Sequence, residues 1–329
     1  AWNKVITRHA MMRACVNDDG LQQILPEVPW YPIRISDWRG DAPSVQQQKL
    51  LEKRGLLSEQ VLDASCWPLF DLQATRLSDR ETRVHLDLDL LTFDVQSFHI
   101  VLAELESNYH QPERQLPPLS WTFRDYQLAE VRDKASLSWR NDRDWWLARL
   151  DEISPAPILP LACQPDQLTK PEFRRLQRRV DSQHWQRLTQ HAAQVGVTSS
   201  AMLLAVFSEV LTGWAESGRF TLNLTHFNRH PWHADVAEMV GDFTAVLLLS
   251  VDCSQSMPFA ERAQRIQQAL RERLAHSRFG GIDLLLEKAK RDSLSESTLM
   301  PVVFTSLLGM DLDRLVEGAN LLGEPEWLY

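Results

Sequence analysis

The sequence predicts an α/β protein in two halves, each of which mixes strands with helices. Residues 83–90 alternate strictly between polar and apolar side chains, and a helical period begins at Val95. Short runs typical of strands occupy 220–225, 243–251 and 301–306. A chain of 329 residues with 44% hydrophobic composition can bury a large core and has room for about two domains.

The N-terminal residues predict a helix that begins almost at residue 1. Val5, Ile6, Met12 and Cys15 fall on one side of it. No capping residue precedes this helix, and residues 323–329 end on apolar side chains without a polar tail. We therefore expect the chain to be a segment of a longer polypeptide, with both its start and its end missing.

The acid-rich stretch 84–97, VHLDLDLLTFDVQS, predicts a strand, a turn and a capped helix. Its apolar positions alternate with the polar set Arg83, His85, Asp87 and Asp89. The helix that follows carries the stripe Val95, Phe98, Leu102, Leu105 and Tyr109. Asp94 stands at the junction, where a carboxylate can accept the free amides of a first helical turn. Taken alone, Asp94 is a helix cap and Asp87 a solvated strand residue.

A polar segment with prolines, 164–175, predicts a crossover between lobes. We expect an N-terminal lobe of residues 1–163 and a C-terminal lobe of residues 164–329. Beyond the crossover, Thr198, Ser199 and Ser200 are candidate caps of a helix. The apolar face predicted for that helix consists of Met202, Val206, Phe207, Val210 and Trp214.

Composition excludes several classes of function. A net charge of −9 and a pI near 5.6 give no basic surface for nucleic acid or an anionic membrane. The longest apolar runs, 201–207 and 245–249, are far shorter than the ~20 residues of a membrane span, so we expect a soluble, cytoplasmic protein. With 12 glycines and no phosphate-binding pattern, nucleotide binding has no support.

The metal-binding residue types form no convincing site. Four scattered cysteines, Cys15, Cys66, Cys163 and Cys253, lack any CxxC pair, so reduced thiols are expected. His226, His230 and His233 are spaced like possible ligands, but Pro231 breaks any helix that would align them. We expect a polar loop near a cleft there and no metal.

Six stretches together point to one family: RHAMMR, DLLTFD, SAMLLAVFSEVLTGW, FTLNLTHFNRHPWH, VGDFTAVLLLSVD and MPVVFTSLLG. In this order, across nearly all 329 residues, they resemble the heterocyclization domains of nonribosomal peptide synthetases, a branch of the condensation-domain superfamily. The sequence is similar in character to synthetases of thiazoline siderophores such as yersiniabactin and pyochelin. The resemblance implies two chloramphenicol-acetyltransferase-like lobes in a V-shaped pseudo-dimer around a central tunnel.

The resemblance also gives the acidic stretch a meaning. Ordinary condensation domains carry HHxxxDG here, whereas this chain has Asp89, Leu90 and then Asp94. Leu90 cannot move a proton, and DxxxxD is the signature of the cyclizing branch. The resemblance implies that Asp89 shapes the tunnel wall and that Asp94 is structural. We expect Asp94 to pair with Arg13 or, failing that, with Arg8.

Further site residues follow from the same resemblance. Thr305 of PVVFTS and Asn228 of FNR match positions associated with cyclodehydration, where an Asp that would lie beyond Tyr329 assists. Asp242 and Thr244 of GDFT match a motif on the tunnel side. The bland alternatives are an ordinary strand threonine at 305 and a turn residue at 242.

The implied reaction joins an acyl thioester to carrier-bound Cys, Ser or Thr and then cyclizes the amide to a thiazoline or oxazoline. Phosphopantetheine arms of upstream and downstream carrier domains would deliver both substrates, with an adenylation domain adjacent in the same polypeptide. We expect no directly bound cofactor and no metal, nucleic-acid or membrane partner. A catalytically silent platform that binds carrier proteins is the alternative. The intact DxxxxD motif and Thr305 favour the enzyme.

Overall fold

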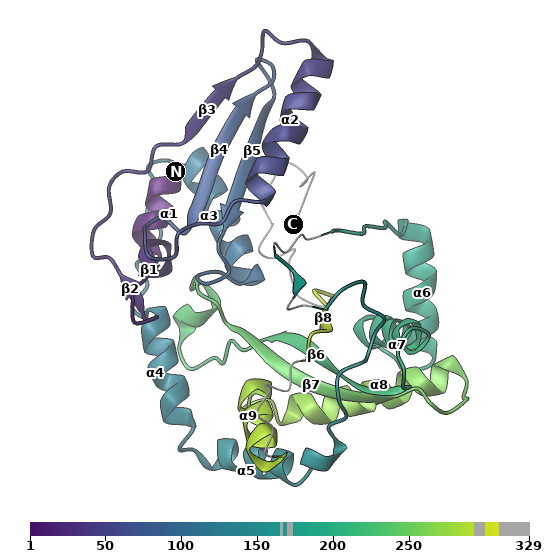
Figure 1. The fold of residues 1–329 in the computed structure, drawn as a ribbon. Coiled ribbons are helices and arrows are strands. Elements are labelled where there is room, and N and C mark those ends of the chain that lie inside the picture. Colours follow the sequence, from purple (N-terminus) through teal and green to yellow (C-terminus); the bar gives the residue numbers. More distant parts are fainter. Residues whose placement is uncertain (165–166, 170–173, 293–299, 309–329) are drawn as a thin grey trace. The chain divides into compact units, whose positions relative to one another are not determined.

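The computed structural model describes residues 1–164, 167–169, 174–292 and 300–308 and divides into two compact units. Unit 1 contains Ala1–Glu130 and Arg229–Phe243, and unit 2 contains Val131–Asn228 and the described residues from Thr244 onward. The elements are labelled in Figure 1.

This division differs from the lobe boundary that we expected between residues 163 and 164. The chain leaves unit 1 after Glu130, and the short segment Arg229–Phe243 returns to it. Proline-rich composition indicates where a chain is irregular. Which unit a segment joins depends instead on side-chain contacts with residues that are distant in the sequence. The contacts of Arg229 described below show this for the returning segment.

Unit 1 is built on a sheet of β3 (Arg34–Asp37), β4 (Phe70–Arg76) and β5 (Thr82–Leu88), in that order. β3 is parallel to β4, and β5 is antiparallel to it, with Phe70 opposite Leu88. A small antiparallel sheet joins β1 (Ala14–Val16) to β2 (Gln22–Ile24). The other elements are α1 (Trp2–Arg8), η1 (Ala10–Arg13), α2 (Pro43–Ser58), α3 (Val95–His110), α4 (Phe123–Asp133, which runs past the end of the unit) and η4 (Ala234–Ala237).

The strand, turn and capped helix predicted from 84–97 are confirmed as β5 and α3. Asp94 is the N-cap, and its Oδ1 accepts a hydrogen bond of 2.6 Å from the Ser97 amide. The buried face of α3 differs from the predicted stripe. Of the five stripe residues, all of them described, Leu105 alone is buried, and Tyr109 is 61% exposed. The face that packs into the core includes Ser97, Ile100, Val101 and Leu105.

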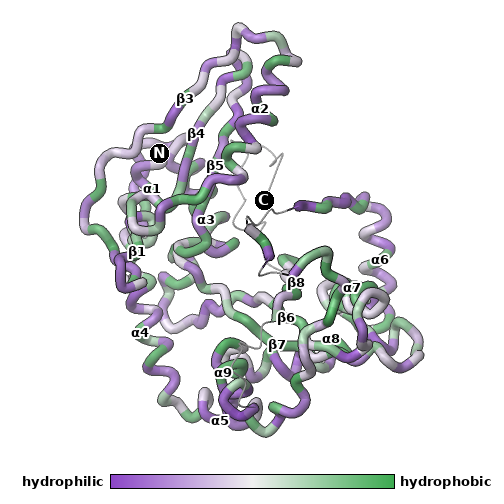
Figure 2. Tube along the Cα trace, viewed as in Figure 1, coloured by the Kyte–Doolittle hydropathy of each residue, from purple (hydrophilic) through white to green (hydrophobic). Residues whose placement is uncertain are grey.

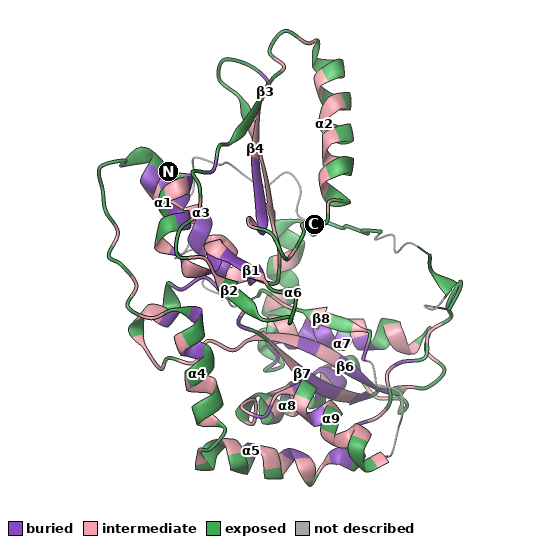
Figure 3. Cartoon of the chain, turned by 60° about the vertical axis from the view of Figure 1, so that its left-hand side comes forward, coloured by how far each residue is buried: buried purple, intermediate pink, exposed green. Residues whose placement is uncertain are grey.

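The core of unit 1 lies on the even-numbered face of β4 and β5, whereas the opposite face is polar. Phe70 and Leu72 pack with aromatic and aliphatic residues of α1 and α3. Helix α2 lies outside this core: the structure describes all of its residues and none of them is buried (Figure 3). It contacts polar groups, since Lys53 Nζ donates to Thr75 Oγ1 at 3.1 Å.

Unit 2 holds the second sheet, in the order β7 (Thr244–Asp252), β6 (Arg219–Phe227), β8 (Val303–Thr305). β7 is antiparallel to β6 and β8 is parallel to it, so the three strands predicted in this half are confirmed. Figure 2 shows hydrophobic residues along β6 and β7. The accompanying elements are α5 (Leu137–Leu147), η2 (Leu150–Glu152), α6 (Ser182–Gln194), α7 (Ser199–Thr212), α8 (Phe259–Ala275) and α9 (Gly281–Asp292).

Helix α7 begins where its capping residues predict, with Thr198 Oγ1 accepting from the Ala201 amide at 3.3 Å. Of its predicted face, Met202 is buried and Phe207 is partly buried against the core, whereas the other three positions were predicted wrongly. Val206, Val210 and Trp214 are 44%, 58% and 67% exposed. The buried residues are Ala201, Met202, Leu204, Ala205 and Ser208. A helix with apolar residues on most sides carries too weak a period to choose between faces.

Within the described residues, no single helix is long and apolar enough to cross a membrane. Helices α6 and α7 meet those requirements only as a pair, which bends by 97° at the break between them.

Candidate functional site

The second carboxylate of DxxxxD is held in a buried ion pair within unit 1. Arg229 Nη2 lies 2.8 Å from Asp94 Oδ1 and 3.0 Å from Oδ2, and Arg229 Nε lies 3.2 Å from Oδ2. The Asp94 side chain is fully buried and that of Arg229 is 7% exposed. Burial lowers the pKa of Arg229, while the Asp94 charge and hydrogen bonds oppose that change. This forked contact satisfies the buried carboxylate.

The remaining donors of Arg229 tie the segment Arg229–Phe243 to itself and to α3. Nη1 donates to the carbonyls of Val236 and Met239 at 2.9 and 2.7 Å. The guanidinium carbon lies 3.9 Å from the centre of the Phe243 ring. Ser97 Oγ donates to the carbonyl of Gly241 at 2.8 Å and accepts from its amide at 3.0 Å. Together these contacts fix the start of α3 against the GDFT motif.

The pairing of Asp94 with Arg13 or Arg8 was therefore predicted wrongly. Arg13 Nη1 instead donates to the carbonyls of Ile6 and Thr7 at 2.7 and 2.8 Å, and burial lowers the pKa of this guanidinium. Arg8 bonds to Glu104 and lies 2.7 Å from Glu238. Arg13 thus bonds within its own segment, and Arg8 pairs with two glutamates, so neither arginine is the partner of Asp94. The six motifs contain one further arginine, Arg229 of FNR, and its presence there could have identified it as a candidate partner of Asp94.

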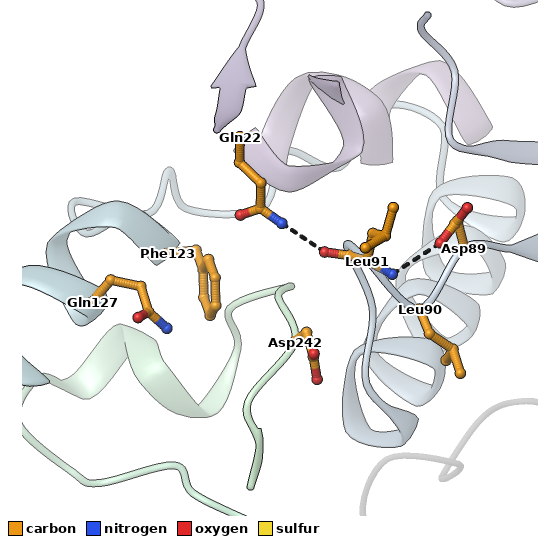
Figure 4. Close-up of a pocket in the computed structure, with 7 residues that line it drawn as sticks. All are labelled: Gln22, Asp89, Leu90, Leu91, Phe123, Gln127 and Asp242. Atoms are coloured by element: carbon orange, nitrogen blue, oxygen red, sulfur yellow. Dashed lines mark hydrogen bonds between the residues drawn. The ribbon is translucent and has the colours of Figure 1, made fainter. Parts of the chain in front are cut away.

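A cavity of about 650 Å³ in unit 1 is lined by Asp89 and Asp242. Gln22, Leu90, Leu91, Phe123 and Gln127 complete its lining (Figure 4). Asp89 Oδ1 accepts from the Leu91 amide at 2.9 Å, and Gln22 Nε2 donates to the Leu91 carbonyl at 2.7 Å. The structure thus brings together two carboxylates that the sequence placed in separate motifs. Sequence reasoning missed Gln22, Phe123 and Gln127.

Asp87, near the end of β5, and Leu90, just after it, differ in burial. Asp87 is half-buried rather than solvated, and burial, followed by the charges of Asp71 and Asp89, raises its pKa. Leu90 is 73% exposed beside the cavity. The exposed group there is an alkyl chain that can neither accept nor donate a proton.

Thr305 lies in β8 of unit 2, opposite Thr225 of β6. Its hydroxyl is exposed and donates to Thr225 Oγ1 at 2.9 Å. The next residue, Ser306, has its hydroxyl 2.8 Å from that of Ser200, in the first turn of α7. The PVVFTS motif is thus held both by the middle strand of the sheet and by the start of a helix.

Asn228 and Thr244 lie at the same end of the β6–β7 pair. Phe227 is the register partner of Thr244, and Asn228 follows Phe227 directly. Because β8 runs alongside β6 as far as Thr225, the residues Thr305, Asn228 and Thr244 gather towards one end of the sheet of unit 2. The sequence assigned these residues to three separate motifs.

Of the three histidines, His226 lies within β6, and His230 and His233 follow this strand in separate surroundings. The backbone amide of His230 donates to the Tyr126 hydroxyl at 3.2 Å, and His233 stacks on Trp121 with ring centres 4.8 Å apart. Among the residues that the structure describes, no group of three or more His, Cys, Asp or Glu side chains could hold a metal ion. All four cysteines are free thiols.

Comparisons with known proteins agree with this arrangement. The condensation-domain family model matches residues 1–312. Pyochelin synthetase PchF of Pseudomonas aeruginosa is 39% identical over 329 residues, all of this chain and 18% of PchF. Phenyloxazoline synthase MbtB of Mycobacterium tuberculosis is 36% identical, over all of this chain and 23% of MbtB. The chain therefore spans about a fifth of the length of these relatives.

A solved structure gives the same result for the fold. The cyclization-docking bidomain of the nonribosomal peptide synthetase EpoB from Sorangium cellulosum matches with a TM-score of 0.81 and 37% identity, over 94% of this chain and 62% of that one. The expected α/β, chloramphenicol-acetyltransferase-like fold agrees with this match, while the V-shaped arrangement around a tunnel stays a prediction. The chain belongs to the condensation-domain family and is similar to the cyclization domain of a nonribosomal peptide synthetase.

Proposed function

We propose that this chain joins a carrier-bound acyl thioester to a carrier-bound Cys, Ser or Thr and then cyclizes and dehydrates the product. The proposal rests on two features that occur together in this chain. An exposed leucine, Leu90, occupies the histidine position of ordinary condensation domains, and Thr305 presents an oriented hydroxyl at the end of the second sheet. The two carboxylates of DxxxxD are intact, and the relatives include a phenyloxazoline synthase.

Amide formation is the easier of the two reactions. The acceptor amine attacks the thioester carbonyl, a C–N bond forms, and the C–S bond breaks to release the upstream phosphopantetheine thiol. A thioester is already activated, so alignment of the two arms supplies much of the rate. This step is compatible with an alkyl group at Leu90.

Cyclodehydration is the harder reaction, because it requires proton transfer. The side-chain thiol or hydroxyl adds to the amide carbonyl, and the resulting carbinol loses its hydroxyl together with the ring N–H proton, so that one water leaves. Hydroxide is a poor leaving group, and the step needs a polar group that can donate or relay a proton. We assign this role to Thr305 and Asn228. Asp94 is structural, while Asp89, Asp242 and Thr244 shape the path of the substrate.

The substrates and partners follow from the same proposal. Upstream and downstream carrier domains deliver both reactants on phosphopantetheine arms, and an adenylation domain lies next to this one in the same polypeptide. Resemblance to a pyochelin synthetase favours cysteine as the cyclized residue, a thiazoline product and a role in siderophore biosynthesis.

Reconstitution with the two carrier proteins tests the proposal. The downstream carrier is loaded in turn with Cys, Ser and Thr, and its intact mass is followed after the loaded upstream carrier is added. We expect the mass of the acyl group to appear first and one water to be lost afterwards. A carrier that gains no acyl group would instead support the silent platform, and an amide that never loses water would limit the chain to condensation.

A further inference from the structure

A pair of hydroxyl groups in unit 2 joins the end strand of the described sheet to its middle strand. Thr225 and Thr305 are register partners in the parallel pairing of β6 with β8, so their side chains lie on the same face. Thr305 Oγ1 donates to Thr225 Oγ1 at 2.9 Å. Thr225 is half-buried, whereas Thr305 is exposed.

The two threonines differ in how firmly their backbones are held. β6 has nine residues and lies between β7 and β8, so Thr225 has a paired residue on both sides, Val246 and Thr305. β8 has three residues and stands at the end of the described sheet, paired with β6. The rigid partner is therefore Thr225, and the residue that needs fixing is Thr305.

A hydroxyl on a short end strand has several staggered orientations open to it. Threonine prefers few rotamers, but water competes for the hydroxyl of an exposed residue. The bond to Thr225 favours the rotamer that places Thr305 Oγ1 next to β6. Small errors in the placement of a reacting group cost large factors in rate.

We propose that Thr225 is a positioning residue for cyclodehydration, which holds the Thr305 hydroxyl in its working orientation. This proposal rests on the role of Thr305 proposed above. Both oxygens carry a proton, so the pair can reverse its polarity by rotation alone: Thr225 donates to Thr305 while Thr305 donates to the departing oxygen. The rotation moves no net proton and needs no further reactant.

The chain offers a matched control on the same strand. Thr221 lies on the same face of β6, and its hydroxyl is 2.7 Å from that of Ser250 on β7. Thr221→Val and Thr225→Val each remove one hydroxyl from an inter-strand pair and keep a β-branched side chain of similar volume. The difference between them is the contact with Thr305.

The experiment measures single-turnover rates of amide and heterocycle formation on the downstream carrier, by intact mass, in the full-length polypeptide that contains this chain. We expect Thr225→Val to slow ring formation about tenfold relative to amide formation, so that the uncyclized amide accumulates. Thr225→Ser, which keeps the hydroxyl, should restore most of the rate. Thr221→Val should leave the ratio of the two rates unchanged.

Thr305→Ala separates this proposal from the one on which it rests. If Thr305→Ala accumulates amide while Thr225→Val behaves like the parent, the positioning role alone is overturned. If Thr305→Ala cyclizes normally, the assigned role of Thr305 fails and this inference fails with it. In the double variant, Thr225→Val should add nothing to Thr305→Ala, and a further tenfold loss would show that Thr225 acts independently.

Discussion

Asp94 and Arg229 form a buried ion pair that attaches the start of α3 to the segment following β6. Their closest atoms are 2.8 Å apart, although 135 residues separate them in the sequence. Asn228, which we assign to cyclodehydration, directly precedes Arg229 in the chain. We therefore expect Asp94 to influence cyclodehydration through the backbone of the FNR motif, and not through its own chemistry.

Loss of the Asp94 charge should destabilise the fold by about 3–5 kcal/mol, because it leaves Arg229 buried and uncompensated. Asp94→Asn separates this effect from capping, since asparagine is an equally good N-cap and a lost cap costs only ~1 kcal/mol. We expect Asp94→Asn to lower the free energy of unfolding nearly as much as Asp94→Ala, as measured by urea denaturation. If Asp94→Asn were as stable as the parent, the carboxylate would matter mainly as a cap.

A double-mutant cycle should identify Arg229, and not Arg13, as the energetic partner of Asp94. Side chains in direct contact couple by about 0.5–3 kcal/mol, whereas independent sites are nearly additive. Arg13 bonds to carbonyls of its own segment. We therefore expect Asp94→Ala and Arg13→Ala to be additive in unfolding free energy, and Asp94→Ala and Arg229→Ala to be strongly non-additive. Coupling of Asp94 to Arg13 would contradict the observed pairing.

Leu90 should be dispensable for proton transfer in both reactions. Its side chain is exposed at the cavity and has no group that titrates. We expect Leu90→Ala to change the rates of amide and heterocycle formation less than about threefold, below the 10²–10⁴-fold contribution of a general acid or base. Asp89→Ala is the comparison, because it removes the carboxylate that accepts from the Leu91 amide. A hundredfold loss in Leu90→Ala would mean that this side chain positions the substrate.

His85 should make stability fall as the pH drops. Burial, with smaller contributions from the charges of Lys53 and Arg83, lowers its pKa from 6.5 to about 4, and its Nε2 lies 3.1 Å from Thr75 Oγ1. Between these two pH values the unfolded chain binds more protons at this residue than the folded one. The contribution of His85 to the free energy of unfolding is therefore complete above pH 6.5 and is lost as the pH falls towards 4.

Urea denaturation midpoints at pH 7 and pH 5 would measure this effect. His85→Gln should reduce the difference between the two midpoints. An unchanged pH dependence in His85→Gln would contradict the assignment.

Local patterns in the sequence predicted most of the strands and the starts of two helices. Strict alternation predicted β5, runs of β-branched and apolar residues predicted β6, β7 and β8, and the capping residues Asp94 and Thr198 marked the starts of α3 and α7. These signals act within one or two turns of the chain, where hydrogen bonds and side-chain periods depend on near neighbours. The motif order was likewise sufficient to identify the family.

The buried faces of the helices and the pairing of charges depend on contacts between distant parts of the chain. Val206 and Val210 lie outside the core although α7 is apolar on most sides, because packing against the rest of unit 2 determines which face of the helix is buried. Asp94 pairs with Arg229 because the segment that begins at Arg229 returns to unit 1 after a long stretch of unit 2. A buried carboxylate needs a forked cation, and no local pattern shows which of three motif arginines the fold will bring within 3 Å of it.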